Sequence, residues 1–179
     1  MQGVSMIRIN LTTDHQVTAA MAGLFRAVNY IPQWEEKSPS FPQKRQYGQP
    51  TFPELVTRQT EAFGAEIAVA LYLEKPIPKW YNRNDKIKAD VGSNIEVKWA
   101  SKEVSPLYIQ SWDRDEDVAV LVVGSAPTYY IVGWMPIAVA KQSKYKNSQN
   151  VEQNNFIVTQ INLQDMETLV RSKYGTALV

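Results

Sequence analysis

The sequence of 179 residues predicts a mixed α/β or α+β fold, in which a central mixed sheet of about five strands is flanked by helices. Three observations lead to this prediction. Apolar residues recur mainly at helical spacing as far as Lys75, alternate with polar residues from Lys86 onward, and return to helical spacing near the end of the chain. The chain has no internal repeat. We therefore interpret residues 1–179 as a single domain.

The N-terminal region, residues 1–50, is predicted to contain a strand, a helix and an arm. Apolar and polar residues alternate over 7–11, which indicates a short strand. A capping box formed by Thr13 and Gln16 then begins a helix over 14–30. This helix is amphipathic, and the residues that recur at helical spacing are Val17, Ala20, Met21, Leu24, Phe25 and Val28.

A proline-rich arm follows this helix. Half of the ten prolines fall between Pro32 and Pro53, in a stretch that also carries Lys44 and Arg45. Proline removes backbone donors and breaks regular structure, so the stretch is interpreted as a loop or arm. Loops of this length that lack secondary structure are usually functional or mobile.

Residues 51–135 are predicted to form the core of the fold. A second capping box, Thr51 with Glu54, begins the helix that we expect to be the longest, and this helix ends near Glu74. The apolar run 118–123 is typical of a central strand that is covered on both faces. Alternation and turn residues together predict strands over 86–91, 95–100, 106–111, 117–124 and 128–135.

The C-terminal region, residues 136–179, begins with a polar stretch over 141–155, interpreted as an exposed loop that a short helix can precede. Its lysines, Lys141, Lys144 and Lys146, are interpreted as a solvated face. A strand over 156–161 and a helix over 164–173 complete the expected elements.

Composition limits the chemistry that this chain can perform. It has no cysteine and one histidine, His15, which falls in the first turn of a helix and is expected to be exposed. Thiolate zinc sites, thiol nucleophiles, histidine-pair metal sites and most hydrolase triads are therefore excluded. Carboxylates, lysine, hydroxyls and a hard metal ion remain. The chain has no apolar run of about 18 residues and no secretory signal pattern, so we expect an intracellular (cytoplasmic) protein without membrane contact.

The strand predicted over 95–100 separates its residues onto two faces. Side chains alternate along a strand, so Ile95, Val97 and Trp99 share one face. Glu96 and Lys98 must then project together from the other face. A carboxylate and an ammonium group are thereby placed side by side on the polar face.

Asp90 adds a second carboxylate if the preceding turn has the right length. A three-residue loop over 92–94 pairs Val91 with Ile95, and Asp90 then lies opposite Glu96 on the same face. A two-residue loop would instead pair Asp90 with Ile95 and place Glu96 on the far side. The spacing is compatible with either loop.

Two facing carboxylates repel each other unless a positive charge lies between them, because their Cβ atoms are about 5 Å apart. A divalent cation suits this position. Mg²⁺ prefers oxygen ligands, binds through few carboxylates and keeps waters that can attack phosphorus. Lys98, on the same face as Asp90 and Glu96, could neutralise charge that develops on a phosphate or hold the attacking water.

Glu66, on the long helix before the sheet, is a fourth candidate. Its helical neighbours Ala62, Phe63, Val69 and Ala70 are apolar, which places its carboxylate on the face expected to pack on the sheet. A buried carboxylate is costly unless it is paired or bound to a metal. The alternative is that Glu66 lies at the edge of the apolar face, where it reaches solvent or meets a lysine.

These residues resemble the PD-(D/E)xK nuclease superfamily, which includes many restriction endonucleases, Holliday junction resolvases and phage exonucleases. The resemblance is carried by Gly64-Ala65-Glu66, Asp90 and Ile95-Glu96-Val97-Lys98, and covers roughly residues 53–135. It implies a restriction-endonuclease-like fold with residues 51–135 as the catalytic core. The activity it implies is metal-dependent hydrolysis of phosphodiester bonds in DNA.

The resemblance also implies a role for each site residue. Asp90, Glu96 and the Val97 backbone carbonyl would bind Mg²⁺, with Mn²⁺ as a substitute, and Glu66 would complete the acidic cluster directly or through water. Lys98 would assist the nucleophilic water. These assignments make Glu66, Asp90, Glu96 and Lys98 the predicted catalytic residues.

The sequence departs from the family pattern in two places. Ala89 stands where the family has its namesake proline, which is often missing. The region after Lys98 leaves little room for the helix that usually precedes the next strand, so the arrangement of residues 100–117 is left open. Gln110 is an accessory candidate, because some members carry a glutamine there, although an ordinary strand residue is the simpler interpretation.

DNA is the expected partner, and its contacts must be local because the net charge is only +1. Trp80, Tyr81 and Trp99 could stack on bases, although such residues more often pack at the edge of a core. The acidic turn over 113–117 is interpreted as exposed rather than as a second metal site. Basic residues expected to contact DNA are Lys79, Arg83, Lys86, Lys88, Lys102, Lys44 and Arg45.

Two other classes of function are compatible with the residues. The chain could be a non-catalytic module that binds nucleic acid or protein on the same fold. A glycosidase with a carboxylate pair is less consistent, because it leaves Lys98 unexplained. A homodimer is expected only if both strands of a duplex are cut. The sequence leaves open endonuclease or exonuclease action and the choice between DNA and RNA.

Overall fold

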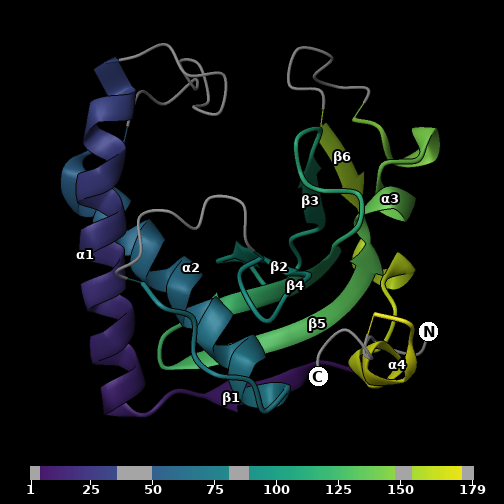
Figure 1. Ribbon diagram of the computed structural model, residues 1–179, viewed down its shortest axis with the longest axis horizontal. Helices are drawn as coiled ribbons and strands as arrows, with labels where there is room; N and C mark the ends of the chain where they lie inside the picture. Colours follow the sequence, from purple (N-terminus) through teal and green to yellow (C-terminus); the bar gives the residue numbers. More distant parts are fainter. Residues whose placement is uncertain (1–4, 36–49, 81–88, 148–154, 175–179) are drawn as a thin grey trace.

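The computed structural model describes residues 5–35, 50–80, 89–147 and 155–174, with side chains of 30–35 excluded. Its main element is a four-stranded mixed sheet with the order β1-β5-β4-β2 (Figure 1). Strand β2 is parallel to β4, whereas β5 is antiparallel to both β4 and β1. The four strands are β1 (Ile7–Asn10), β2 (Ile95–Ala100), β4 (Val118–Ser125) and β5 (Thr128–Pro136).

A second, two-stranded antiparallel sheet contains β3 (Leu107–Gln110) and β6 (Asn155–Val158). The mixed α+β class is thus confirmed. The main sheet has four strands rather than about five, because β3 pairs with β6 and leaves the main sheet. The strand expected over 86–91 falls partly outside the described residues, and of its described part only Val91 forms a bridge, with Ile95.

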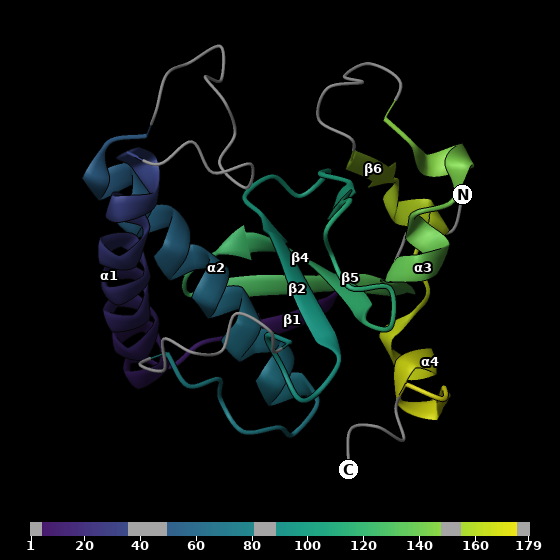
Figure 2. The same cartoon turned by 45° about the horizontal axis from the view of Figure 1, so that its top comes forward.

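Two long helices form an outer layer on the main sheet, and two short helices lie elsewhere. Helix α2 (Phe52–Tyr72) lies against the main sheet, and α1 (Thr13–Glu35) packs on α2 (Figures 1 and 2). The short helices are α3 (Ile137–Ala140) and α4 (Met166–Arg171). None of the described helices has the combination of length and hydropathy that a membrane span requires.

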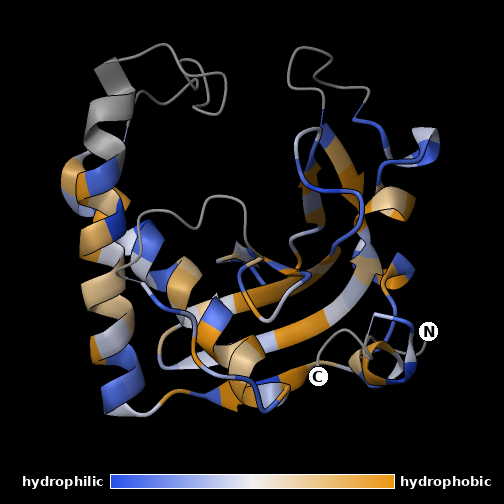
Figure 3. Cartoon of the chain, viewed as in Figure 1, coloured by the Kyte–Doolittle hydropathy of each residue, from blue (hydrophilic) through white to orange (hydrophobic). Residues whose placement is uncertain are grey.

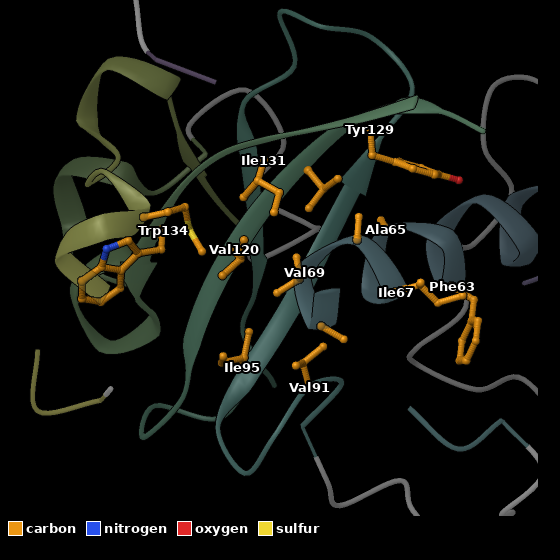
Figure 4. Packing of buried hydrophobic residues seen from close by; sticks show 14 of the residues in the cluster. Phe63, Ala65, Ile67, Val69, Val91, Ile95, Val120, Tyr129, Ile131 and Trp134 are labelled. Atoms are coloured by element: carbon orange, nitrogen blue, oxygen red, sulfur yellow. The ribbon is translucent and has the colours of Figure 1, made fainter. Parts of the chain in front are cut away.

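Helix α2 begins at the expected capping box. The Thr51 backbone N–H donates to Glu54 Oε2 at 2.8 Å, and the Glu54 N–H donates to Thr51 Oγ1 at 3.4 Å. The helix is continuously buried from Phe63 to Ala70, where it packs on residues of β4 and β5 (Figure 4). It has 21 residues and α1 has 23, so the prediction that α2 is the longest helix is wrong.

Helix α1 packs through small residues instead of its large apolar ones. Ala19, Ala22 and Ala27 are buried, and a Cβ atom on Gly23 would lie 2.1 Å from Thr60 Oγ1 of α2. Small side chains let the two helix axes approach closely. Most of the expected apolar face is therefore exposed by 47 to 53%, namely Val17, Met21, Leu24 and Val28, which we call the α1 stripe.

The start of α1 also differs by one residue from the expected cap. The His15 backbone N–H donates to Thr12 Oγ1 at 3.3 Å, so Thr12 rather than Thr13 accepts at the helix start. His15, expected to be exposed, is half-buried.

Strand β4 is covered on both faces, as its apolar run predicts. Val118, Val120 and Val122 pack with α2, whereas Ala119 and Leu121 belong to a second cluster with β3 and α3. Figure 3 shows hydrophobic residues along β4 and also along α1. The two clusters place the main sheet in the middle of the molecule.

The connection from β2 to β4 contains no helix, although parallel neighbours usually need a helical crossover. Residues 101–117 are all described, and they contain β3 and turns. Lys141 holds the end of this connection: its Nζ donates to the Asp113 carbonyl, to the Ser111 carbonyl at 3.1 Å and to Asp115 Oδ1 at 2.6 Å. Lys141 is therefore a structural contact, and the expectation that it belongs to a solvated face is wrong.

Candidate active site at the edge of strand β2

The turn before β2 has the length that places Asp90 and Glu96 together. Val91 and Ile95 exchange both backbone hydrogen bonds, at 3.1 and 3.3 Å, around the three-residue loop 92–94. Gly92 has a φ of 62°, which glycine adopts at little cost. The three-residue loop is confirmed, and the two-residue alternative is excluded.

Asp90 lies at the open edge of the main sheet. Strand β2 is the last strand of that sheet, and β4 occupies its other side. Asp90 Oδ2 accepts a hydrogen bond of 2.8 Å from the Val97 backbone N–H. The N–H and C=O of one strand residue point to the same side, so the Val97 carbonyl also faces this open edge.

Asp90 and Glu96 both resist ionisation. Burial raises the pKa of Asp90 to about 7, with a further increase from the charge of Glu66. Burial likewise raises the pKa of Glu96 to about 7, and the neighbouring Asp90 contributes to this increase. Each carboxyl group is therefore partly protonated near neutral pH, and a cation between them would favour the ionised forms.

Glu66 is buried but fully paired. Its side chain comes from α2 and both oxygens accept hydrogen bonds from Arg26 of α1, at 2.6 and 2.8 Å. Arg26 also lies 4.7 Å from the centroid of the Phe63 ring. Burial raises the pKa of Glu66 despite Arg26, and the charge of Glu96 adds to the increase. Glu66 meets an arginine inside the molecule rather than a lysine or solvent at its edge.

Lys98 lies between two carboxylates. Its Nζ is 3.1 Å from Glu96 Oε1 and 2.9 Å from the Asp113 carboxylate. Burial by itself would lower the pKa of Lys98, but Glu96 and Asp113 outweigh burial and raise it. Lys98 therefore stays protonated at neutral pH, so it can supply charge but cannot act as a general base.

Asp113 is a site residue that the sequence interpretation missed. Its side chain is only 6% exposed, and it accepts a 2.8 Å hydrogen bond from the Gln110 N–H as well as the contact from Lys98. The acidic turn was interpreted as exposed, and this holds for Asp115 and Glu116 but not for Asp113 or Asp117. Contiguous acidic residues give no sign of which ones turn inward.

Arg26 was missed as well, although the sequence does carry a signal. It is the only Asp, Glu, Lys or Arg between Asp14 and Glu35, in a helix that is otherwise small or apolar over most of its inner turns. A lone charge in such a helix usually needs a buried partner. Glu66, a carboxylate on the apolar face of the next helix, is that partner.

A pocket of about 190 Å³ adjoins Lys98. Residues of β2 and β3 line it, and they include Tyr108 and Gln110. The structure thus brings the accessory candidate Gln110 to the same pocket as Lys98.

Trp80, a candidate for base stacking, packs edge-on against Phe25 with 5.8 Å between ring centroids.

Few of the expected DNA-contacting residues lie in the described part of the chain. Lys79, which follows α2 in the chain, and Lys102, which follows β2, are both exposed. The remaining predictions, Arg83, Lys86, Lys88, Lys44 and Arg45, fall outside the described residues, as does Tyr81. Trp99, a candidate for base stacking, is half-buried, and its indole N–H donates to the Gly124 carbonyl at 2.9 Å.

Asp90, Glu96 and the Val97 carbonyl are the oxygen donors that fit a hard cation. Among the described residues, no three acidic or histidine side chains converge closely enough to hold a metal ion on their own. Mg²⁺ does not require three, because it commonly uses one or two carboxylates and keeps several waters. Glu66 differs from this set because both of its oxygens are already bonded to Arg26.

Comparison of the chain with protein-family models, with curated proteins and with solved structures yields no match. The geometry of the site and the chemistry of its residues therefore carry the functional argument.

Proposed function

We propose that this protein is a Mg²⁺-dependent deoxyribonuclease of the restriction-endonuclease-like fold, with Mn²⁺ as a substitute metal. One observation carries the proposal: Asp90 and Glu96, both half-buried, lie close together at an open sheet edge with pKa values raised to about 7, and Lys98 lies beside them. Repelling carboxylates are unfavourable without a cation, and such arrangements are concentrated at functional sites.

In this proposal each group has a distinct task. Asp90, Glu96 and the Val97 carbonyl hold the metal ion, which when bound polarises a phosphoryl oxygen and makes a water molecule more acidic. Lys98 remains an ammonium ion and stabilises the negative charge that develops on the phosphate. Asp113 orients Lys98 by accepting a second hydrogen bond from its ammonium group, besides the one that Glu96 accepts. Glu66 keeps its carboxylate near Asp90 while Arg26 neutralises it.

The experiment combines cleavage with cation binding. Linear, circular, single-stranded and branched DNA and a matched RNA are incubated with Mg²⁺, Mn²⁺ or EDTA, and Mn²⁺ binding is measured by calorimetry. Asp90→Asn is expected to abolish both cleavage and binding, whereas Glu103→Gln, an exposed carboxylate on the adjoining loop, leaves both unchanged. Equal cleavage by wild type and Asp90→Asn, or none on any substrate with either metal, would rule out the proposal.

A non-catalytic module on the same fold is the second candidate. It is favoured by the fact that Glu66 and Lys98 already have partners of opposite charge in Arg26 and Asp113. Such a module would bind nucleic acid or another protein without cleaving DNA. It would cleave none of the substrates with either metal, which distinguishes it from a nuclease in the same experiment.

Cleavage of both strands of a duplex would use a homodimer, and the α1 stripe supports such a pairing. Its residues, Val17, Met21, Leu24 and Val28, are spaced by four, three and four positions, as in the seam between two paired helices. Four half-exposed side chains cover less than the roughly 800 Å² per partner of a stable interface, so the dimer should dissociate on dilution. Analytical ultracentrifugation should detect it at high concentration, and Leu24→Glu should remove it. A monomer at every concentration would contradict this assignment.

A further inference from the structure

The pocket beside Lys98 is small, and its lining includes the aromatic ring of Tyr108 and the amide of Gln110. It lies between β2 and β3, with Leu121 of β4 and Pro106 among its lining residues. Its volume of about 190 Å³ is below the roughly 300–1,000 Å³ of pockets that enclose drug-sized ligands. A single ring system fits this volume, and a base pair does not.

Alternation along β3 sends its polar residues into this pocket. Leu107 and Ile109 are completely buried in the core, so Tyr108 and Gln110 project from the opposite face, where they line the pocket. Tyr108 remains 45% exposed, which leaves a large part of its ring available for stacking. No described residue exchanges a hydrogen bond with the side-chain amide of Gln110, which carries both donors and acceptors.

A second exposed aromatic residue is the sequence neighbour of a residue that contacts Lys98. Trp112 is 57% exposed and directly precedes Asp113, the residue that contacts Lys98. The aromatic residues singled out from the sequence behave differently, since Trp80 and Trp99 pack against the core. Exposed aromatic side chains beside a cation are typical of proteins that bind single-stranded nucleic acid.

We propose that this pocket binds one unpaired nucleobase, which stacks on Tyr108 and exchanges hydrogen bonds with Gln110, next to the phosphate held at Lys98. This inference rests on the phosphodiesterase function proposed above and names its substrate class. A base that is paired and stacked within a duplex cannot enter a pocket of this size. The substrate is therefore single-stranded DNA, or DNA with an unpaired nucleotide at the point of cleavage.

Binding tests this proposal independently of cleavage. Fluorescence anisotropy of a labelled single-stranded oligonucleotide and of a blunt-ended, fully paired two-strand duplex is measured in EDTA and, in parallel, with Ca²⁺. Tyr108→Ala should weaken single-strand binding by about 5- to 160-fold, the range expected from loss of one base–aromatic stack, and change duplex binding less than about twofold. Tyr108→Phe keeps the ring and should bind like wild type. Val170→Ala, an exposed apolar residue on α4, is the matched control.

The outcomes separate this inference from the proposed function. Single-strand binding that depends on Tyr108, without cleavage under any condition, would support the base pocket and contradict the nuclease. Cleavage that does not respond to Tyr108→Ala would support the nuclease and overturn the base pocket. Equal losses on single strand and duplex, or no binding by the wild type in either EDTA or Ca²⁺, would also overturn the base pocket.

Discussion

Two cations neutralise carboxylates near β2, and they do so differently. Arg26 joins α1 to α2 by a bidentate contact in which both oxygens of Glu66 are used. Lys98 is shared between Glu96 and Asp113 and also borders a pocket. The Arg26 contact compensates a buried charge and links α1 to α2. The Lys98 contacts instead leave a cation beside a space that a ligand can enter. This difference indicates that Arg26 mainly stabilises the fold and that Lys98 is the cation placed where a ligand can reach it.

The largest effect is expected from breaking the Arg26 contact. Arg26→Met removes the charge that compensates buried Glu66, and loss of one partner of a buried pair costs about 3–5 kcal/mol of unfolding free energy. The double variant Arg26→Met with Glu66→Leu should recover most of this loss, because no unpaired charge remains. Urea denaturation of the two single variants and the double variant measures the loss of unfolding free energy in Arg26→Met and its recovery in the double variant. A double variant no more stable than Arg26→Met would show that the pair is not a structural contact.

Lys98 should show the opposite profile. Lys98→Met is expected to reduce the cleavage rate by about 10²–10³-fold, the range seen when one preorganised charge or donor is removed from an active site. Its melting temperature should fall less than that of Arg26→Met, because Asp113 keeps the Gln110 N–H as a partner whereas Glu66 loses both of its hydrogen bonds. Lys102→Met, an exposed lysine just after β2, is the matched control and should remain active. Full activity of Lys98→Met would remove the distinction between the two cations.

The pH dependence of stability tests the carboxyl groups that lie between these cations. Asp90 and Glu96 keep their protons up to about pH 7 in the folded protein, but lose them near pH 4 when the chain unfolds. The unfolded state thus binds fewer protons between these values, and stability without divalent cations should fall by roughly 2–4 kcal/mol from pH 5 to pH 8.

Urea denaturation in EDTA at both pH values measures this change. Glu66 has a raised pKa and acts in the same direction, whereas exposed Glu54 has a lowered pKa and opposes it weakly. Glu96→Gln should reduce the difference between pH 5 and pH 8, and Mg²⁺ at pH 8 should restore stability to the wild type. Stability that is constant or rises over this range would contradict the electrostatic description of the site.

The smallest effect is expected at Asp113, which orients Lys98 from outside the metal ligands. Asp113→Asn keeps the size of the side chain but removes one charge, while Glu96 still holds Lys98. The rate should fall about tenfold, equivalent to about 1.4 kcal/mol, with little change in KM. Glu116→Gln, an exposed residue of the same turn, is the control. A loss as large as that of Lys98→Met would assign Asp113 a direct part in the reaction.

Local patterns predicted much of the fold and three residues of the site. The capping box of α2 and the alternation along β2 depend on residues a few positions apart, and the structure confirms both, since Ile95, Val97 and Trp99 all pack with the cluster on the α2 side. The loop over 92–94 brings Asp90 to the Val97 backbone because strand parity fixes which side chains share a face. Such features need no knowledge of distant contacts.

Contacts between distant residues were not predictable in the same way. Periodicity placed the large apolar residues of α1 in the core, but the structure buries its alanines and Gly23 against α2. The pairing of Arg26 with Glu66 joins residues 40 positions apart, and that of Lys98 with Asp113 joins residues 15 positions apart. No local pattern specifies these partners.

The sequence by itself determined which side chains each strand and turn present, because backbone geometry repeats every two residues in a strand. It thereby set Glu96 and Lys98 on one face of β2, whereas the three-residue loop that brings Asp90 to the edge of β2 was one of two that the spacing allowed. Only the tertiary structure decided that Arg26 neutralises Glu66, that Asp113 turns inward to Lys98, and that Tyr108 and Gln110 line a pocket beside it. These contacts follow from how helices and sheets pack, which depends on the shapes of surfaces assembled from the whole chain.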